Sequence, residues 1–219
     1  MKLNTTKNIC FNLSSMDLVA LLCSRICHDI ISPIGAIHNS LELLDEVGIE
    51  DEVMQLIRLS SMSAIIRLKF MRLAFGYTGS VDSLIGLGDI EQVIEDFIAV
   101  DKRVQVSWTG EKIDLSRERA KILLNLFMVA HASLPRGGKV TISVQDSKNE
   151  NIFSLKINGN LARFPEKFTQ IVDGNVESTI DSHDIQFYYV ILLAHENKIR
   201  LLPEIIDDHN VVLSALLEK

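Results

Sequence analysis

The sequence predicts an α+β protein in which a long helical hairpin precedes a sandwich of helices on one face of a mixed or antiparallel sheet. Apolar residues recur at helical spacing through residues 16–47 and again through 51–77. Beyond residue 79 the pattern changes to alternating helix-like and strand-like segments. The Gly-Tyr-Thr-Gly-Ser stretch at residues 76–80 is typical of a linker. We therefore expect an N-terminal leader at residues 1–15, a helical hairpin at 16–78 and an α/β sandwich domain at 79–219.

The first helix is predicted over residues 16–47. Its apolar stripe consists of Leu22, Ile26, Ile30, Ile34, Ile37, Leu41 and Leu44. Pro33 lies within this segment, and a proline inside a helix removes a hydrogen bond and produces a kink. The alternative is a helix that ends at Ser32, followed by a second one that begins at Pro33. The periodicity continues through the proline without a phase change, which favours one kinked helix.

The second helix is predicted over residues 51–77, after a short connection that contains Gly48. One apolar seam would pack on the first helix to make an antiparallel hairpin, and it consists of Val53, Ile57, Ala64, Leu68, Met71 and Phe75. A second apolar face exceeds what one hairpin can cover, and it contains Ile65, Ile66, Phe70, Leu73 and Ala74. Pairing two hairpins into a four-helix bundle would bury this face, so we predict a homodimer.

The second domain is predicted to alternate helices and strands. Helical patterns cover residues 89–100, 115–132 and 184–196, and strand patterns cover 103–108, 139–145, 152–157, 199–202 and 211–216. The strands at 139–145 and 152–157 have a hydrophilic tip between them and form a predicted hairpin. This order favours a sheet with its helices on one face.

Composition narrows the functional classes. The formal net charge is −7, from 22 basic and 29 acidic residues, and no basic run occurs, which argues against a nucleic-acid surface. No continuous run approaches the roughly 20 apolar residues of a membrane span, and residues 1–6 lack the apolar core of a signal peptide. We therefore predict a cytoplasmic protein without a membrane segment. The odd set of Cys10, Cys23 and Cys27 implies no disulfide framework, and we expect buried thiols rather than metal ligands.

His28 is the leading candidate for a functional residue. It lies two positions from both Ile26 and Ile30, so it points roughly opposite the apolar stripe. Its own face carries small or polar residues, namely Ser24, Arg25, Ser32 and Gly35. An exposed imidazole on a rigid helix with little bulk around it suits a group that another macromolecule must reach. The alternative is an ordinary surface histidine.

Two segments resemble the core of a two-component sensor histidine kinase. His28-Asp29 with Ser32-Pro33 resembles the histidine box of that family, and residues 122–130 with Gly137-Gly138 resemble its asparagine box and the strand that follows. The resemblance implies a dimerisation and phosphotransfer hairpin, followed by an ATPase-like sandwich of the Bergerat type.

The nucleotide-binding boxes of that family are degenerate here. Val129 stands where the kinases have a magnesium-binding asparagine, and a valine offers no oxygen to a hard cation. Residues 157–161 lack the aspartate that binds adenine. Residues 181–186 contain no glycine to let backbone amides approach phosphates. The resemblance therefore implies a chain that does not bind ATP.

A histidine box kept beside a degenerate ATP site resembles the ChpT-type histidine phosphotransferases of bacterial phosphorelays. The match is close over residues 21–37, and the segment at 186–189 also fits. In that family a homodimer accepts a phosphoryl group from the receiver domain of a hybrid kinase and passes it to response regulators that control the cell cycle. The resemblance implies that His28 is the phosphoacceptor and that the receiver supplies Mg²⁺, so the chain itself needs no cofactor.

The residues around His28 are candidates for catalysis and for receiver contacts. Asp29 adjoins His28 but should point away from its face, so orienting the ring or contacting the partner is as plausible as general-base catalysis. Arg25 and Ser32, one turn to either side, are candidate receiver contacts. Ile31 and Gly35 would let a partner helix approach closely. Two alternatives stay open, an active kinase with an atypical nucleotide pocket and a dimeric adaptor that is never phosphorylated.

Overall fold

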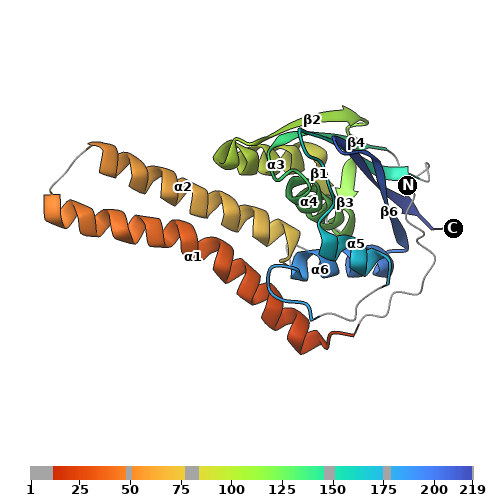
Figure 1. Ribbon diagram of the computed structural model, residues 1–219, viewed down its shortest axis with the longest axis horizontal. Coiled ribbons are helices and arrows are strands. Elements are labelled where there is room, and N and C mark those ends of the chain that lie inside the picture. The colour runs from red at the N-terminus through yellow and green to blue at the C-terminus, as the bar shows by residue number, and fades with distance from the viewer. Residues whose placement is uncertain (1–11, 48–50, 77–83, 146–150, 175–178, 219) are drawn as a thin grey trace.

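The computed structural model describes residues 12–47, 51–76, 84–145, 151–174 and 179–218. Two long helices, α1 (Ser15–Val47) and α2 (Asp51–Ala74), form an antiparallel hairpin that projects from a layered α/β body (Figure 1). The predicted α+β class with an N-terminal hairpin is confirmed. The predicted helix connection at residues 48–50 and the predicted boundary at residue 79 lie outside the described residues.

The body is built on a five-stranded sheet in the order β2-β4-β5-β7-β6. Its strands are β2 (Val104–Gly110), β4 (Gly138–Val144), β5 (Asn151–Asn158), β6 (Ile199–Asp207) and β7 (Asn210–Leu217). β2 and β4 are parallel, whereas the other neighbouring strands are antiparallel. The helices α3 (Leu87–Asp101), α4 (Arg117–Ala132) and α6 (Ile185–Glu196) lie on one side of this sheet and face the hairpin (Figure 1).

Three short elements were not predicted from the sequence. β1 (Leu84–Gly86) pairs antiparallel with β3 (Asp114–Ser116) in a separate two-stranded sheet, and α5 (Glu166–Val172) precedes the last helix. The helix predicted from residue 115 begins instead after Ser116, whose side chain accepts a hydrogen bond from the Arg119 N–H. Strands of three residues and a helix of seven are too short to show a reliable hydrophobic period.

Helix α1 is continuous through Pro33, as the periodicity predicts, and it changes direction partway along its length (Figure 1). Ser14 caps its first turn, accepting a hydrogen bond from the Asp17 N–H at 3.1 Å. Just before α1, the Leu13 N–H donates to the Tyr188 hydroxyl at 3.3 Å. This contact holds the start of α1 against α6.

The predicted hairpin seam is partly wrong. Ile34 and Leu41 on α1 are 52% and 48% exposed, and Leu68 on α2 is 54% exposed. By contrast, Phe70 and Ala74, which were expected to need a second hairpin, are fully buried. The Phe70 ring lies 4.7 Å from that of Phe97 and 6.1 Å from that of Phe127. The body therefore covers the last turns of α2, and the exposed apolar residues lie farther along the hairpin.

Two other expectations need correction. Cys23 and Cys27 are exposed free thiols rather than buried ones, because both lie on the side of α1 that faces away from α2 and the body. Within the described residues, α1 is also long and apolar enough by length and composition to cross a membrane, with an 18-residue window of mean hydropathy 1.4. The expectation counted only uninterrupted apolar runs, whereas this window tolerates scattered polar residues.

Asn125 joins the hairpin to the body. The residue is 1% exposed on α4, and its Nδ2 donates to the Ala74 carbonyl at the end of α2 and to the Lys121 carbonyl, each at 2.9 Å. The bond to Ala74 satisfies a helix-terminal carbonyl that has no partner within α2. Asn125 therefore caps the end of α2 from within the body.

Replacing Asn125 with alanine leaves the Ala74 carbonyl without this donor, and we expect the free energy of unfolding to fall by about 1–3 kcal/mol. Urea unfolding followed by circular dichroism measures this loss. Gln92→Ala is the matched control because the Gln92 side chain is exposed and, among the residues that the structure describes, bonds only to Asp96, at 2.7 Å. Its expected change is within about 0.5 kcal/mol. Equal losses in the two variants would contradict the assigned role of Asn125.

Candidate functional site

His28 lies on the open face of α1 with its side chain 60% exposed, as its position opposite the apolar stripe predicts. Ile31 is 68% exposed and Ser32 is also exposed. A Cβ built on Gly35 would meet no atom within 4 Å. The three residues follow His28 by three, four and seven positions, so they continue its face along the helix.

Asp29 lies closer to His28 than helix geometry alone suggested. Its Oδ1 is 3.4 Å from His28 Nδ1, and its Oδ2 accepts a hydrogen bond from Arg25 Nε at 2.9 Å. The Asp29 side chain is only 13% exposed. Adjacent helical residues diverge at Cβ, but an imidazole and a carboxylate are long enough to converge beyond it. Asp29 is thus placed to orient the His28 ring.

Arg25 is directed inward rather than toward solvent. Its side chain is 16% exposed, and besides Asp29 it donates through Nη1 to the backbone carbonyl of His183 at 3.1 Å. His183 belongs to the segment Asp181–Asp184 that immediately precedes α6. Arg25 therefore connects α1 to the body beside His28.

His183 is the residue at this site that sequence reasoning missed. Its ring lies edge-to-face against that of His28, with 4.7 Å between centroids and an interplanar angle of 79°. In the sequence it was only one of several histidines scattered through the second domain. The pattern Asp-Ser-His-Asp indicates a local turn, but nothing in it shows which residue the turn will face.

The two acids of this segment differ in their surroundings. Hydrogen bonds from the backbone N–H of Asp184 and of His183 lower the pKa of Asp181. Burial raises the pKa of Asp184, and the negative charge of Asp181 adds to that effect. The charges of Lys167, His183 and Arg25 oppose this rise in the pKa of Asp184.

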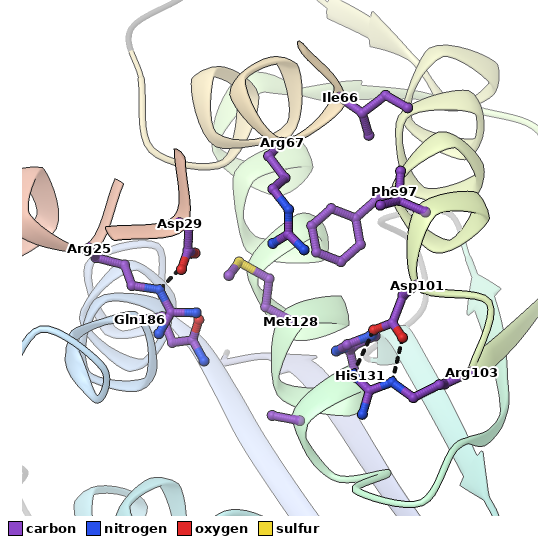
Figure 2. A pocket seen from close by; sticks show the side chains of 12 residues that line it. Arg25, Asp29, Ile66, Arg67, Phe97, Asp101, Arg103, Met128, His131 and Gln186 are labelled. Atoms are coloured by element: carbon purple, nitrogen blue, oxygen red, sulfur yellow. Dashed lines mark hydrogen bonds and ion pairs between the residues drawn. The ribbon is translucent and has the colours of Figure 1, made fainter. Parts of the chain in front are cut away.

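A cavity of about 200 Å³ separates the hairpin from the body beside this site (Figure 2). Arg25 and Asp29 lie at one end, and Asp101, Arg103 and His131 at the other. The full lining is Arg25, Asp29, Ile66, Arg67, Phe97, Val100, Asp101, Arg103, Met128, His131, Ala132 and Gln186. Within the described part of the chain, the buried Oε1 of Gln186 has no hydrogen-bond partner.

His131 and Asp101 form a hydrogen bond at the far end of this cavity. His131 Nε2 lies 2.7 Å from Asp101 Oδ2, and Arg103 also bonds to the same carboxylate. Burial lowers the pKa of His131, and the charge of Asp101 opposes this only in part. The neighbouring rings of Phe97 and Phe127 account for that burial. The hydrogen bonds from Arg103 lower the pKa of Asp101.

The positions that resemble nucleotide-binding residues are occupied by packing contacts. Val129 is completely buried within α4. A Cβ on Gly159 would lie 2.7 Å from the Gly137 carbonyl oxygen, so this glycine serves backbone packing. Among the described residues, no group of three or more His, Cys, Asp or Glu side chains is arranged to hold a metal ion.

Comparison with known proteins places this geometry in context. The sequence profile of the family described as "Histidine phosphotransferase C-terminal domain" matches residues 87–209. Protein phosphotransferase ChpT of Brucella abortus (strain 2308) is 42% identical over 185 residues, which cover 84% of this chain and 88% of that protein.

Solved structures agree. The structure of a bacterial phosphotransferase superposes with a TM-score of 0.86 at 38% identity, over 95% of this chain and all of that one. Histidine kinase ThkA, solved in complex with response regulator TrrA, gives a TM-score of 0.50 at 13% identity, over 93% of this chain and 63% of that one. This second likeness shows the fold alone.

The lowered pKa of His131 predicts a pH dependence of stability. Between the folded pKa and the ordinary value of 6.5, the unfolded chain binds more protons than the folded one. The stabilisation that comes from keeping His131 neutral in the folded chain is therefore complete above pH 6.5. It is lost as the pH falls from 6.5 through the folded pKa. We expect the free energy of unfolding to fall below this pH with a slope of at most about 1.4 kcal/mol per pH unit from this group.

His131→Gln should flatten that slope in urea unfolding between neutral and mildly acidic pH. His38→Gln is the matched control, because the His38 side chain is 70% exposed. Identical slopes in wild type and His131→Gln would show that burial of His131 does not control the response.

Proposed function

The chain belongs to the histidine phosphotransferase family, and from that premise we propose that His28 carries the phosphoryl group. The protein is a histidine phosphotransferase of a phosphorelay. The observation that supports His28 is its exposed ring on α1, with Nδ1 turned toward Asp29. Within the described residues, His28 Nε2 has no hydrogen-bond partner, so the phosphoryl group of a donor protein can reach this nitrogen.

The geometry suggests how the reaction proceeds. A carboxylate beside Nδ1 favours the tautomer with its proton on that nitrogen, which leaves the lone pair on Nε2. Nε2 attacks phosphorus in line as the bond to the receiver's aspartate breaks, and the aspartate leaves as a carboxylate. The product ring keeps the Nδ1 proton and is positively charged beside Asp29. The reverse reaction delivers the phosphoryl group to a second receiver.

We propose that the donor is the receiver domain of a hybrid histidine kinase and that the acceptors are response regulators, including regulators of the cell cycle. The receiver would supply Mg²⁺ and transition-state charge stabilisation, since phosphoryl transfer depends mainly on positioning and electrostatics. The residues of this chain fit a metal that is held by the receiver, because the buried Val129 stands where the resembling kinases have a metal-binding side chain.

The proposed docking face for the receiver is the continuation of His28 along α1. Ile31 offers an exposed apolar side chain, and Ser32 and Gly35 allow a partner helix to approach the backbone. Arg25 was predicted as a receiver contact, but its side chain is engaged with Asp29 and His183. We therefore propose that Arg25 supports the site from within the chain.

We also propose a homodimer in which two hairpins form a four-helix bundle. Large apolar side chains are exposed on both helices of the hairpin, and they include Leu56, Leu59, Met62, Ile65, Leu68, Ile34 and Leu41. Exposed apolar side chains gathered on one projecting element favour a protein–protein interface. A second copy of the hairpin, packed side by side, would cover part of this surface.

The cytoplasm is the proposed compartment. Cys23 and Cys27 are exposed free thiols, which persist in a reducing environment. A dimer interface on the hairpin also accounts for the apolar character of α1 without a membrane.

Labelling with radioactive phosphate tests the phosphoacceptor. We expect His28 to acquire label from a phosphorylated receiver domain and none from magnesium-ATP, and we expect His28→Ala to acquire none. His38→Ala is the matched control, since His38 is an equally exposed histidine on the same helix, and it should label like wild type. Chelation by EDTA should stop transfer, because the metal is the receiver's.

Two outcomes would replace this assignment. Label acquired from ATP alone would indicate an active kinase with an atypical pocket. A His28→Ala protein that still activates response regulators would indicate an adaptor that is not phosphorylated.

Replacing Ile31 with serine tests the docking face. We expect receiver affinity to fall about tenfold, the loss usual for removing one exposed apolar contact from an interface. Isothermal titration calorimetry measures it, and sedimentation should show an unchanged dimer. Met16→Ser is the control, because Met16 is 79% exposed, lies outside the proposed dimer surface and is 12 residues from His28 along α1, about 18 Å away. Equal affinity of wild type and Ile31→Ser for the receiver would exclude this face.

A further inference from the structure

The body of the protein contacts the phosphoacceptor candidate directly through one side chain. The His183 ring packs edge-to-face on the His28 ring, 4.7 Å between centroids. His183 comes from the segment that resembles the phosphate-binding box of the kinases, 155 positions farther along the chain. A residue with no place in nucleotide binding therefore stands beside the reacting imidazole.

The backbone of His183 is held on both sides. Its N–H donates to Asp181 Oδ1 at 2.8 Å, and the Asp184 N–H donates to the same oxygen at 2.9 Å. Its carbonyl accepts from Arg25 Nη1 at 3.1 Å. The side chain of His183 is thus presented to His28 from a fixed backbone rather than from a free loop tip.

The His28 ring is contacted on two sides by groups of different origin. Asp29, on its own helix, lies 3.4 Å from Nδ1, which is a long contact that restrains the ring weakly. His183 contributes the second restraint from the body. An imidazole that is 60% exposed would otherwise turn about its side-chain bonds between reactive and unreactive orientations.

We propose that His183 is a positioning residue for phosphotransfer, holding the His28 ring by edge-to-face contact so that Nε2 faces the incoming phosphoryl group. The proposal rests on His28 being the phosphoacceptor. Arg25 acts one step further out, since it fixes the segment that carries His183. The lost phosphate box thereby has a second use, as a support for the histidine.

Positioning makes a specific kinetic prediction. An edge-to-face pair of rings has an interaction of the size that corresponds to about threefold to tenfold in rate. Loss of the ring should slow every phosphorylation of His28, whatever the donor. Loss of a receiver contact would instead slow transfer only from receivers.

A small donor separates these two cases. Phosphoramidate is a suitable probe because it has no surface that docks on the protein. In the zwitterion of phosphoramidate the nitrogen already has three protons. His28 Nε2 forms a bond to phosphorus as the P–N bond breaks, ammonia leaves with the bonding electron pair, and the Nδ1 proton stays on the ring. The rate is followed by phosphate incorporation into the full-length protein, with His28→Ala as the blank.

Three variants carry the test. We expect His183→Ala to be about threefold to tenfold slower than wild type with phosphoramidate and with a phosphorylated receiver. His183→Phe keeps an aromatic ring without its nitrogens and should recover most of both rates. Ser182→Ala, in the same segment, should match wild type. Because His183 is exposed, thermal unfolding should be unchanged in all three.

Nuclear magnetic resonance detects the contact between the His183 and His28 rings without any phosphotransfer reaction. The Hε1 resonance of His28, assigned by its absence in His28→Ala, should shift in His183→Ala because the ring current is removed. It should stay in place in Ser182→Ala. A merely structural residue elsewhere in the segment would not move this signal.

The proposal is overturned if His183→Ala reacts with phosphoramidate at the wild-type rate, or if it is slow with the receiver alone. It is also overturned if His183→Phe is as slow as His183→Ala, since that result would require a nitrogen rather than a ring. Failure of the underlying function looks different. In that case wild type acquires no label from the receiver, while the phosphoramidate rates and the resonance shift still report on the two rings.

Discussion

The site depends on one side chain, Arg25, which bonds to two groups from different parts of the fold. Its guanidinium donates to the Asp29 carboxylate on α1 and to the His183 carbonyl ahead of α6. A planar guanidinium with several donors can hold both acceptors in a fixed geometry, which a lysine could not do. Asp29 and His183 both contact the His28 ring, so this one residue links the polar and the aromatic contact of the histidine.

This arrangement requires the body to be held firmly against the hairpin. The fully buried Phe70 packs against the rings of Phe97 and Phe127, and Asn125 bonds to the carbonyl end of α2. At the other end of the contact, the Leu13 N–H bonds to Tyr188 on α6. Several weak contacts at separate points restrict rotation between the two parts more than one contact would. The cavity between them shows that packing is not continuous along the whole junction.

The degenerate nucleotide region explains why such a contact is available. A loop that must receive a polyphosphate needs glycines and space for backbone amides to approach the ligand. Here the corresponding segment has Asp181 and Asp184, and it lies against α1 instead. Val129 is fully buried in apolar packing. In this chain these residues therefore pack or bond within the protein.

The fold class, the continuity of α1 through Pro33 and the exposure of His28 could be read from the sequence, because each depends on local periodicity. The side chains at the positions that resemble the nucleotide boxes of the kinases can also be read from the sequence, and what they imply for ATP binding stays a prediction. The sequence did not show which apolar residues of α2 are covered. Leu68, expected to pack on α1, is exposed, and Phe70, expected on the face left for a second hairpin, is fully buried. The burial of a helix face depends on what packs there, and the rings that cover Phe70 come from α3 and α4, 27 and 57 positions later in the sequence.

The difference between local and tertiary information also explains why His28 could be predicted and the residues that surround it could not. The helix itself presents His28, so sequence alone identified it as a candidate. The inward direction of Arg25 and the contact with His183 were decided by the tertiary structure, because they join residues more than 150 positions apart. No local pattern encodes which surface a turn will face once the chain has folded.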